Sequence, residues 1–291
     1  MDNKNWKGWL YLLPAMLFLG AFMVYPLIDV FIYSFEEGYN SASQTFFGVG
    51  TYNYSYILRD PYFLQALKNT LILVIITVPV STGLALLISV GLASIKPLRN
   101  LFQTIYFLPY VTNTLAVGLV FMILFKPTAY SDGLVNLLIN LFGGPTVDFI
   151  GGPYWAKMFV LCFYTVWVVM PFKILILTSA LASVKQDYYN AAKLDGCGTF
   201  KILTKVAMPM SKSGLVCTML LSFLDGWNMV EQPMVFLQNA RDYPLGVFLA
   251  VQSGEAISLA GSLLSMLPVL LLFLYFRDEL SEGVEFLGVK G

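Results

Sequence analysis

The sequence contains no histidine, which is the commonest metal ligand and general base in proteins. Its three cysteines, Cys162, Cys197 and Cys217, are scattered and form no CxxC pair, so we expect neither a disulfide framework nor a metal site. The formal net charge is +0, so the basic excess typical of nucleic-acid-binding proteins is missing. These absences argue against a metalloenzyme and against a nucleic-acid partner.

Charged residues are also scarce. They make up 12% of the 291 residues, whereas hydrophobic residues make up 58%. A soluble globular chain is nearer about 25% charged. The mean hydropathy of +0.73 points the same way. The composition therefore predicts a protein that crosses a membrane several times.

Six apolar runs are long enough to be membrane-spanning helices, which need about 20 mostly apolar residues. The first run is longer than the apolar part of a signal peptide, so we expect an uncleaved span. The predicted fold class is an all-α membrane protein with six transmembrane helices. We divide it into a first helix with an external loop (1–67), a core of five helices (68–280) and a tail (281–291). The runs are 9–35, 69–93, 101–125, 156–184, 214–237 and 258–276.

Basic residues are distributed unevenly between the two sides of these spans. Eleven Lys and Arg residues fall on the side of the termini and five on the other side. Because cytoplasmic loops carry the excess of Lys and Arg, both termini and the loop 184–213 are predicted to be cytoplasmic.

Two external segments are expected to form helices at the membrane surface. One is "RDPYFLQAL" in the loop 36–68, and the other is "DGLVNLLINLF" in the loop 126–155. The second carries an i, i+3, i+4, i+7, i+8 stripe of apolar residues, which is typical of a helix lying flat on a membrane. The stripe consists of Leu134, Leu137, Leu138, Leu141 and Phe142.

The loop 184–213 is charged and hinged, although apolar runs flank it. We predict a helix capped by Asp187 and stopped by Gly196, then a turn, then a second helix that Thr199 caps and Pro209 ends. Such a helix–bend–helix element can dock in a groove on a soluble partner. An ordinary connecting loop with interfacial helices is the alternative. One apolar face of the second helix would carry Phe200, Leu203 and Val206.

This loop resembles the cytoplasmic signature of permease subunits of binding-protein-dependent ABC importers, in which E-A-A-x-x-D-G-A precedes F-x-x-I-x-L-P. Here the signature is Asn190-Ala191-Ala192, Asp195-Gly196-Cys197, then Leu203, Val206 and Met208-Pro209. Three further stretches resemble the carbohydrate-uptake branch, most closely the maltose and glycerol-phosphate types. They are "NTLILVIITVPVSTGLALLISVGL", "FQTIYFLPYVTNTLAVGLVFMILF" and "FLDGWN", and the resemblance extends over about 9–277.

The resemblance implies a permease in a bacterial inner membrane that pairs with a second, different permease and sits on two ATP-binding-cassette ATPase subunits. No G-x-x-x-x-G-K loop is present, so ATP and Mg would be bound by those partners, and this chain would be neither an enzyme nor a cofactor carrier. An extracellular or periplasmic solute-binding protein would deliver a sugar. The loop 184–213 would be the coupling element in the ATPase cleft, through Tyr188, Asn190, Ala191, Ala192, Asp195, Gly196, Phe200, Leu203 and Pro209.

Asn190 departs from the signature, which has glutamate at this position. Asparagine donates and accepts hydrogen bonds but forms no ion pair. Either the contact with the ATPase is neutral, or the ATPase differs at the facing position. The alternative is that Asn190 is only a helix-surface residue.

Polar groups near the bilayer midplane are costly and usually functional in transporters. In the fifth run, Trp227 and Glu231 are four residues apart and Asn228 flanks them, so an aromatic plate would lie beside hydrogen-bonding groups, as suits a sugar. The matching block of the family contributes substrate contacts. The alternative is a bond from Asn228 or Glu231 to the partner permease. Four more candidates for the substrate path are Asn113, Thr114, Thr165 and Phe172, for which a bond to the same helix or a core-facing aromatic ring is the alternative.

Lys173 lies inside the fourth run, where a lysine is expensive unless it is paired or snorkels. It could pair with Glu231, with an anionic substrate or with a carboxylate of the second permease, and we favour the last.

Two rival functions are weaker. An ion-coupled secondary transporter would need an intramembrane acid–base relay or inverted repeats, and the sequence shows neither. A membrane-embedded enzyme would need His, Asp or Glu clustered near one interface, which is also not found.

Overall fold

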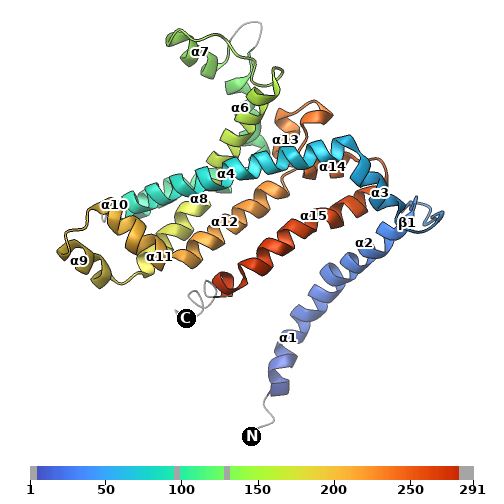
Figure 1. The fold of residues 1–291 in the computed structure, drawn as a ribbon, viewed down its shortest axis with the longest axis horizontal. Helices are drawn as coiled ribbons and strands as arrows, with labels where there is room; N and C mark the ends of the chain where they lie inside the picture. Colours follow the sequence, from blue (N-terminus) through green and yellow to red (C-terminus); the bar gives the residue numbers. More distant parts are fainter. Residues whose placement is uncertain (1–4, 95–98, 128–131, 282–291) are drawn as a thin grey trace. The chain divides into compact units, whose positions relative to one another are not determined.

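The computed structural model describes residues 5–94, 99–127 and 132–281, and the regular elements of these residues are helices apart from one short hairpin. The all-α class predicted from the sequence is therefore confirmed for the described chain (Figure 1). Lys96 and most of the predicted tail 281–291 lie outside the described residues. Contacts divide the chain into two units, Met1–Leu64 with Leu249–Pro268, and Gln65–Phe248 with Val269–Gly291.

The first unit begins with one long helical segment. α1 (Asn5–Leu19) continues through a π turn (Gly20–Val24) into α2 (Tyr25–Phe35). The π turn comes directly before Pro26, which has no N–H and would clash with the carbonyl four residues back in a regular helix. The wider turn lets the Tyr25 N–H bond to the Gly20 oxygen five residues back, so the chain stays helical.

A hairpin and a short helix follow α2. β1 (Glu36–Glu37) pairs antiparallel with β2 (Gly48–Val49), and α3 covers Tyr52–Arg59. The buried Asn53 amide donates to the Ser34 oxygen at 2.9 Å and to the Glu36 oxygen at 3.1 Å, which fixes α3 against the end of α2. The Glu255 carboxylate, at the start of α15 (Glu255–Tyr275), accepts bonds from the backbone N–H and the hydroxyl of Ser41.

The second unit is built around α4 (Pro61–Ser94), α8 (Tyr154–Ser183) and α12 (Lys212–Trp227). Four helical segments of the described chain are long and apolar enough to cross a membrane, and a fifth is formed if the bent pair Thr199–Met210 and Lys212–Trp227 counts as one. The predicted runs 101–125 and 214–237 are each interrupted. The first consists of α5 (Arg99–Val111) and α6 (Thr114–Phe125), and the second of α12 and α13 (Glu231–Phe236).

Of the two helices predicted at the membrane surface, one is not a separate helix and the other is present as a helix. "RDPYFLQAL" is not a separate helix, because Pro61 begins α4 and the Asp60 carboxylate accepts the Tyr62 N–H at 2.8 Å, after which the chain stays helical to Ser94. The second prediction is confirmed as a helix, α7 (Leu134–Leu141). Asn136 on its inner side is buried and bonds to the Asp132 and Val147 oxygens, whereas the apolar stripe is exposed.

Aromatic rings form the main core of the second unit. The buried Tyr164 ring of α8 lies edge-on to Phe121 and to Phe236, and the Tyr164 hydroxyl donates to the Thr114 oxygen at 2.7 Å. Gly118 of α6 faces Val235 of α13 at contact distance. This core therefore holds α6 and α13 together against α8. The remaining short helices of the unit are α9 (Gln186–Leu194), α10 (Thr199–Ile202), α11 (Met208–Met210), a 3₁₀ turn (Ala240–Asp242) and α14 (Leu245–Val251), which continues into the first unit.

Candidate functional site

The loop with the permease signature folds as helix, bend and helix at one end of α8 (Figure 1). α9 ends in a Schellman motif, in which the Gly196 N–H bonds to the Lys193 oxygen and the Cys197 N–H bonds to the Ala192 oxygen, both at 3.0 Å. Gly196 has φ +75°, a backbone conformation that side chains disfavour. The predicted stop at Gly196 is confirmed.

The predicted cap at Asp187 is wrong by two residues. Lys185 is the N-cap and has no capping side-chain bond. Asp187 instead lies in the first turn of α9, where its negative charge is favourable beside the positive end of the helix dipole.

The second helix differs more from the prediction. Gly198 rather than Thr199 is its N-cap, and Pro209 does not end it. A π turn (Leu203–Ala207) precedes Pro209, and the Met208 N–H reaches back five residues to the Leu203 oxygen. The helix therefore continues to Met210 and then bends by 78° into α12.

The π turn also changes which side chains face inward. Ile202 and Ala207 are buried, Leu203 is half-buried, and Phe200 is 79% exposed. Phe200 and Leu203 line one hollow against α4, as the predicted shared face requires, whereas Val206 does not line it, because the extra residue in the π turn shifts the helical register after Leu203. Ala207 packs in a cluster with Leu177 of α8 and Ala85 of α4.

The outer surface of this helix–bend–helix element, the predicted coupling element, is open. Ala192 lies on the buried side of α9. The exposed residues of the element include Tyr188, Asn190, Ala191, Asp195 and Phe200. The structure thus presents most of the signature residues on one element and keeps its small alanine inside.

A cavity of about 500 Å³ lies behind this element. Val90 of α4, Thr178 of α8, and Tyr189 and Lys193 of α9 are among its lining residues. The Thr178 hydroxyl is buried and has no hydrogen-bond partner within the described chain. The Tyr189 hydroxyl donates to the Leu181 oxygen at 3.3 Å, and burial raises the pKa of Tyr189 above its usual value.

Three of the predicted substrate-path residues meet where α6 and α13 begin. The Asn113 side chain caps α6 by accepting the Ala116 N–H at 3.0 Å. The Thr114 hydroxyl donates to the Glu231 carboxylate at 3.4 Å. The break between α5 and α6 therefore places an amide, a hydroxyl and a carboxylate close together.

Trp227 and Glu231 do not share one helix face as predicted, because α12 ends at Trp227 and α13 begins at Glu231. The Trp227 indole is 3% exposed and stacks on Phe223 at 5.2 Å, so it is not an open plate in this structure. Asn228 is the C-cap of α12, and its amide donates to the Leu224 oxygen at 3.0 Å. The role of these residues in the substrate path stays a prediction.

The two predicted residues of α8 lie in different surroundings. The Thr165 hydroxyl is buried and donates to the Leu161 oxygen at 2.7 Å. The Phe172 ring stacks on Tyr110 of α5, with ring centres 5.1 Å apart and planes 10° apart.

Lys173 is 1% exposed and pairs with neither Glu231 nor any other carboxylate at ion-pair distance in the described chain. Its ammonium group donates to the Val78 oxygen and to the hydroxyls of Ser81 and Thr82, all in α4. The pairing with Glu231 is therefore wrong, and the favoured pairing with a carboxylate of the second permease stays a prediction. Two adjacent hydroxyl residues after Pro79, Ser81 and Thr82, are a weak sequence signal for this site.

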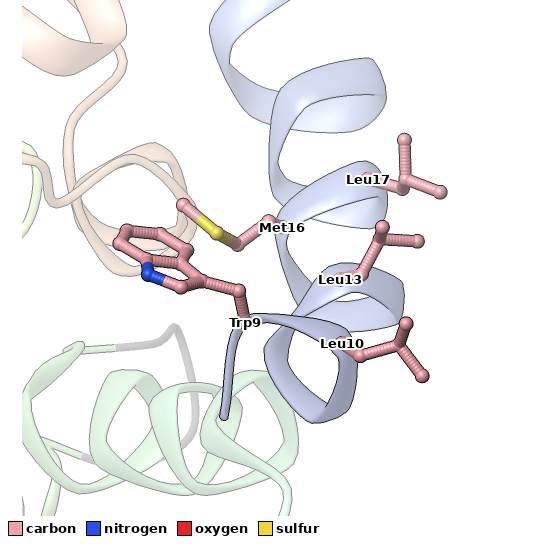
Figure 2. Close-up of a pocket in the computed structure, with 5 residues that line it drawn as sticks. All are labelled: Trp9, Leu10, Leu13, Met16 and Leu17. Carbon is pink, nitrogen blue, oxygen red and sulfur yellow. The ribbon is translucent and has the colours of Figure 1, made fainter. Parts of the chain in front are cut away.

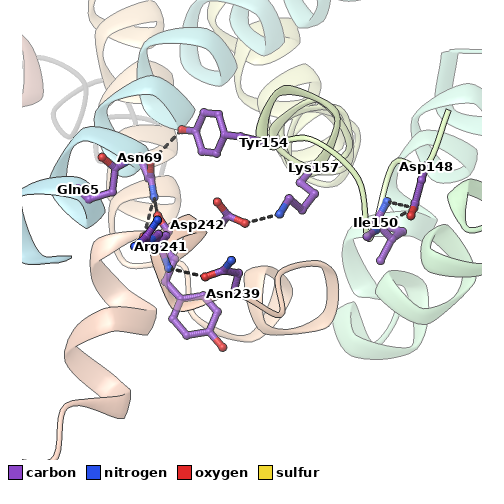
Figure 3. Close-up of polar contacts among 11 residues, drawn as sticks. Gln65, Asn69, Asp148, Ile150, Tyr154, Lys157, Asn239, Arg241 and Asp242 are labelled. Carbon is purple, nitrogen blue, oxygen red and sulfur yellow. Dashed lines mark hydrogen bonds and ion pairs between the residues drawn. The ribbon is translucent and has the colours of Figure 1, made fainter.

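Sequence reasoning missed a polar cluster at the opposite end of α4 and α8 (Figure 3). The Tyr154 hydroxyl donates to the Asn69 side-chain oxygen at 2.8 Å, and the Asn69 amide donates to the Arg241 and Tyr243 oxygens. Lys157 forms an ion pair with Asp242, and both side chains are nearly buried. The cluster ties the segment after α13 to the ends of α4 and α8.

An open hollow of about 320 Å³ lies on α1, between Trp9, Leu10, Leu13, Met16 and Leu17 (Figure 2). Its lining is almost wholly apolar, and the indole N–H of Trp9 is the one side-chain donor among these five residues, so the hollow is poorly suited to the hydroxyls of a sugar.

The fold is that of solved bacterial ABC-transporter chains. One is from the crystal structure of a bacterial ABC transporter involved in the import of the acidic polysaccharide alginate, with TM-score 0.79, 17% identity and coverage of 94% of this chain and 95% of that chain. Another is from an alginate ABC transporter in complex with an alginate pentasaccharide-bound periplasmic protein, with TM-score 0.77, 16% identity and coverage of 94% and 93%.

Sequence comparison identifies the family. Residues 81–277 match the binding-protein-dependent transport system inner membrane component. The lactose transport system permease protein LacF of Rhizobium radiobacter is 30% identical over 80% of this chain and 76% of its own length. The arabinooligosaccharides transport system permease protein AraP of Bacillus subtilis strain 168 is 29% identical over 85% and 77%. The chain belongs to the family of binding-protein-dependent transport system inner membrane components, as its signature predicted, and nothing in these relatives supports an ion-coupled transporter.

Proposed function

We propose that this chain is one of two permease subunits of an ATP-driven ABC importer, and that it forms half of the pathway for a sugar or oligosaccharide. The observation that carries the proposal is the family match over 81–277, together with relatives whose names specify lactose and arabinooligosaccharides. ATP and Mg are bound by two partner ATPase subunits. A solute-binding protein delivers the sugar, and the second permease is a different chain.

The chain crosses a bacterial inner membrane six times with both termini in the cytoplasm. The four long apolar helices supply the first, second, fourth and sixth crossings. The third crossing is formed by α5 with α6, and the fifth by α12 with α13. Broken spans are typical of transporters, because unwound backbone and helix ends near the midplane contact the substrate. The excess of basic residues on the side of the termini supports this orientation.

α9 and the helix that follows it form the coupling element, which docks in a cleft of the ATPase. The exposed Tyr188, Asn190, Ala191, Asp195 and Phe200 offer contacts, and the Schellman motif at Gly196 fixes the bend. Packing of Ala207 with Ala85 and Leu177 ties the element to α4 and α8. Closure of the ATPase dimer therefore moves these helices as near-rigid bodies and switches the cavity between inward-facing and outward-facing states.

The substrate path follows the two helix breaks. Asn113, Thr114 and Glu231 provide the hydrogen-bonding groups, and Phe172 with Tyr110 provides an aromatic surface. Asn228 lies in the second break, and Trp227 and Thr165 lie under the surface of the path.

The test is uptake by the complete transporter. The chain is co-expressed with its second permease, ATPase subunits and binding protein, and the uptake of labelled lactose, arabino-oligosaccharides and other neutral sugars is measured in vesicles. We expect uptake of at least one sugar that is lost when the ATPase is inactivated and kept when an ionophore collapses the ion gradients. Uptake with the opposite dependence would support the ion-coupled alternative, and uptake of no sugar would contradict the proposed substrate class.

A further inference from the structure

Two proline-containing turns meet inside the second unit. Pro79 lies within α4 and Pro171 lies within α8. Each proline lacks the N–H that would bond to the carbonyl four residues back, so each helix is weaker at that turn. Lys173, two residues after Pro171, reaches Val78, the residue directly before Pro79.

The Lys173 ammonium group has a complete set of acceptors in α4. It donates to the Ser81 hydroxyl at 2.5 Å, the Thr82 hydroxyl at 3.0 Å and the Val78 oxygen at 3.3 Å. The Thr82 hydroxyl in turn donates to the Val78 oxygen at 2.7 Å, and the Ser81 hydroxyl donates to the Thr77 oxygen, so each hydroxyl offers a lone pair to the ammonium. Three acceptors match the three N–H groups of a lysine.

Burial makes the loss of any of these hydrogen bonds costly. Lys173 is 1% exposed, and Ser81 and Thr82 are also buried, so water does not replace a missing acceptor. The charge of Asp225 in α12 also interacts with that of Lys173, beyond ion-pair distance. Moving this cation away from its acceptors is costly, because the N–H groups of the ammonium would then lack hydrogen-bond partners in an apolar surrounding.

The neighbouring residue connects this contact to the substrate path. Phe172 precedes Lys173 on α8, and its ring stacks on Tyr110 of α5. The turn that follows Pro171 is therefore attached to α4 through Lys173 and to α5 through Phe172.

We propose that Lys173 is a positioning residue for transport, which braces the proline-containing turn of α8 against that of α4 and thereby holds Phe172 against Tyr110. With the brace in place, α4 and α8 move as one body when the coupling element is pushed. This inference rests on the proposed function, and it adds a residue that the coupling element and the substrate path do not include.

The experiment compares removal of the cation with removal of its acceptors, in the complete transporter reconstituted in proteoliposomes. Lys173→Met keeps the length of the side chain and removes the charge. Ser81→Ala with Thr82→Val removes two acceptors and keeps the side-chain volumes similar. Uptake, ATP hydrolysis and the ratio of ATP hydrolysed to sugar transported are measured. Ser179→Ala is the matched control, because among the described residues that hydroxyl on α8 bonds to the Leu175 oxygen of its own helix alone.

We expect both changes to lower uptake several-fold, up to about thirtyfold, and to raise the ATP-to-sugar ratio, while the control stays at the wild-type value. The triple variant should be no worse than Lys173→Met alone, because the three side chains act through one contact. If Lys173→Met does not assemble, Ser81→Ala and Thr82→Val are measured singly, since each leaves the ammonium two acceptors.

A wild-type ATP-to-sugar ratio in the assembled variants, or defects that multiply in the triple variant, would overturn the proposal. A failure of the proposed function is distinguishable from this, because in that case the wild-type transporter would take up no sugar.

Discussion

The Thr114 hydroxyl lies 3.4 Å from the Glu231 carboxylate, although 117 residues separate them in the chain. The two residues meet because both begin a helix directly after a break, Thr114 at the start of α6 and Glu231 at the start of α13. The packing of α6 and α13 on Tyr164 fixes that meeting point.

Glu231→Gln tests whether this meeting point belongs to the substrate path. The amide keeps the shape and can still accept the Thr114 bond, but it removes the charge. We expect the KM for sugar uptake to rise by about tenfold with little change in the maximal rate, since one hydrogen bond to a charged group contributes about 1.5–3 kcal/mol. Initial uptake rates over a range of sugar concentrations would measure this. An unchanged KM would remove Glu231 from the path.

Gly196→Ala tests the coupling element. At φ +75° an alanine is strained by about 1 kcal/mol, so the bend should shift and the transmission of movement from the ATPase should weaken. We expect lower sugar uptake at unchanged amounts of subunit in the membrane. Gly198→Ala is the matched control, because Gly198 has φ −70° and open space around its Cβ position. Equal uptake in both variants would show that the bend at Gly196 has no special role.

Asp242→Asn tests the polar cluster at the ends of α4 and α8, in which Asp242 pairs with Lys157. The change leaves the Lys157 ammonium nearly buried without its carboxylate, which costs about 3–5 kcal/mol for a buried pair. We expect a clear fall in the thermal unfolding midpoint of the purified subunit, and a smaller fall in the double variant Lys157→Met/Asp242→Asn. Glu279→Gln breaks the exposed pair with Lys212 and should leave the midpoint unchanged. A midpoint for Asp242→Asn equal to that of Glu279→Gln would contradict the assignment.

Labelling of single cysteines tests the orientation. Leu194 is 89% exposed on the coupling element, and Phe142 is 92% exposed at the end of α7. In a variant without the native cysteines, we expect Phe142→Cys to react with a membrane-impermeant maleimide in intact cells, and Leu194→Cys to react only after the cells are opened. Labelling of both cysteines in intact cells would contradict the predicted topology.

Local rules read from the sequence were reliable where one residue decides the outcome. Gly196 ends α9 because only a residue without a side chain adopts its backbone conformation without strain, and that is visible in the sequence. Pro209 was misread because the π turn before it depends on how Leu203 and Ala207 pack against α8 and α4.

Contacts between residues far apart in the chain could not be predicted from the sequence. The pattern showed that Lys173 is anomalous, but the acceptors lie 91–95 residues earlier in the chain, and serine and threonine in a helix usually bond to their own backbone. Trp227 and Glu231 were placed on one face because a continuous helix was assumed, and the break after Trp227 depends on how α12 and α13 pack separately.

The π turn at Leu203–Ala207 has a consequence for the residues that follow it in the same helix. It adds one residue to a helical turn, which corresponds to about 100° of rotation in a regular α-helix. Met208, Pro209 and Met210 are turned by that amount relative to α10, whereas α12 starts anew after the 78° bend at Ser211. The deletion of one residue from the π turn would therefore turn a residue other than Met208 towards the cluster of Ala85 and Leu177, without changing any residue of α4 or α8.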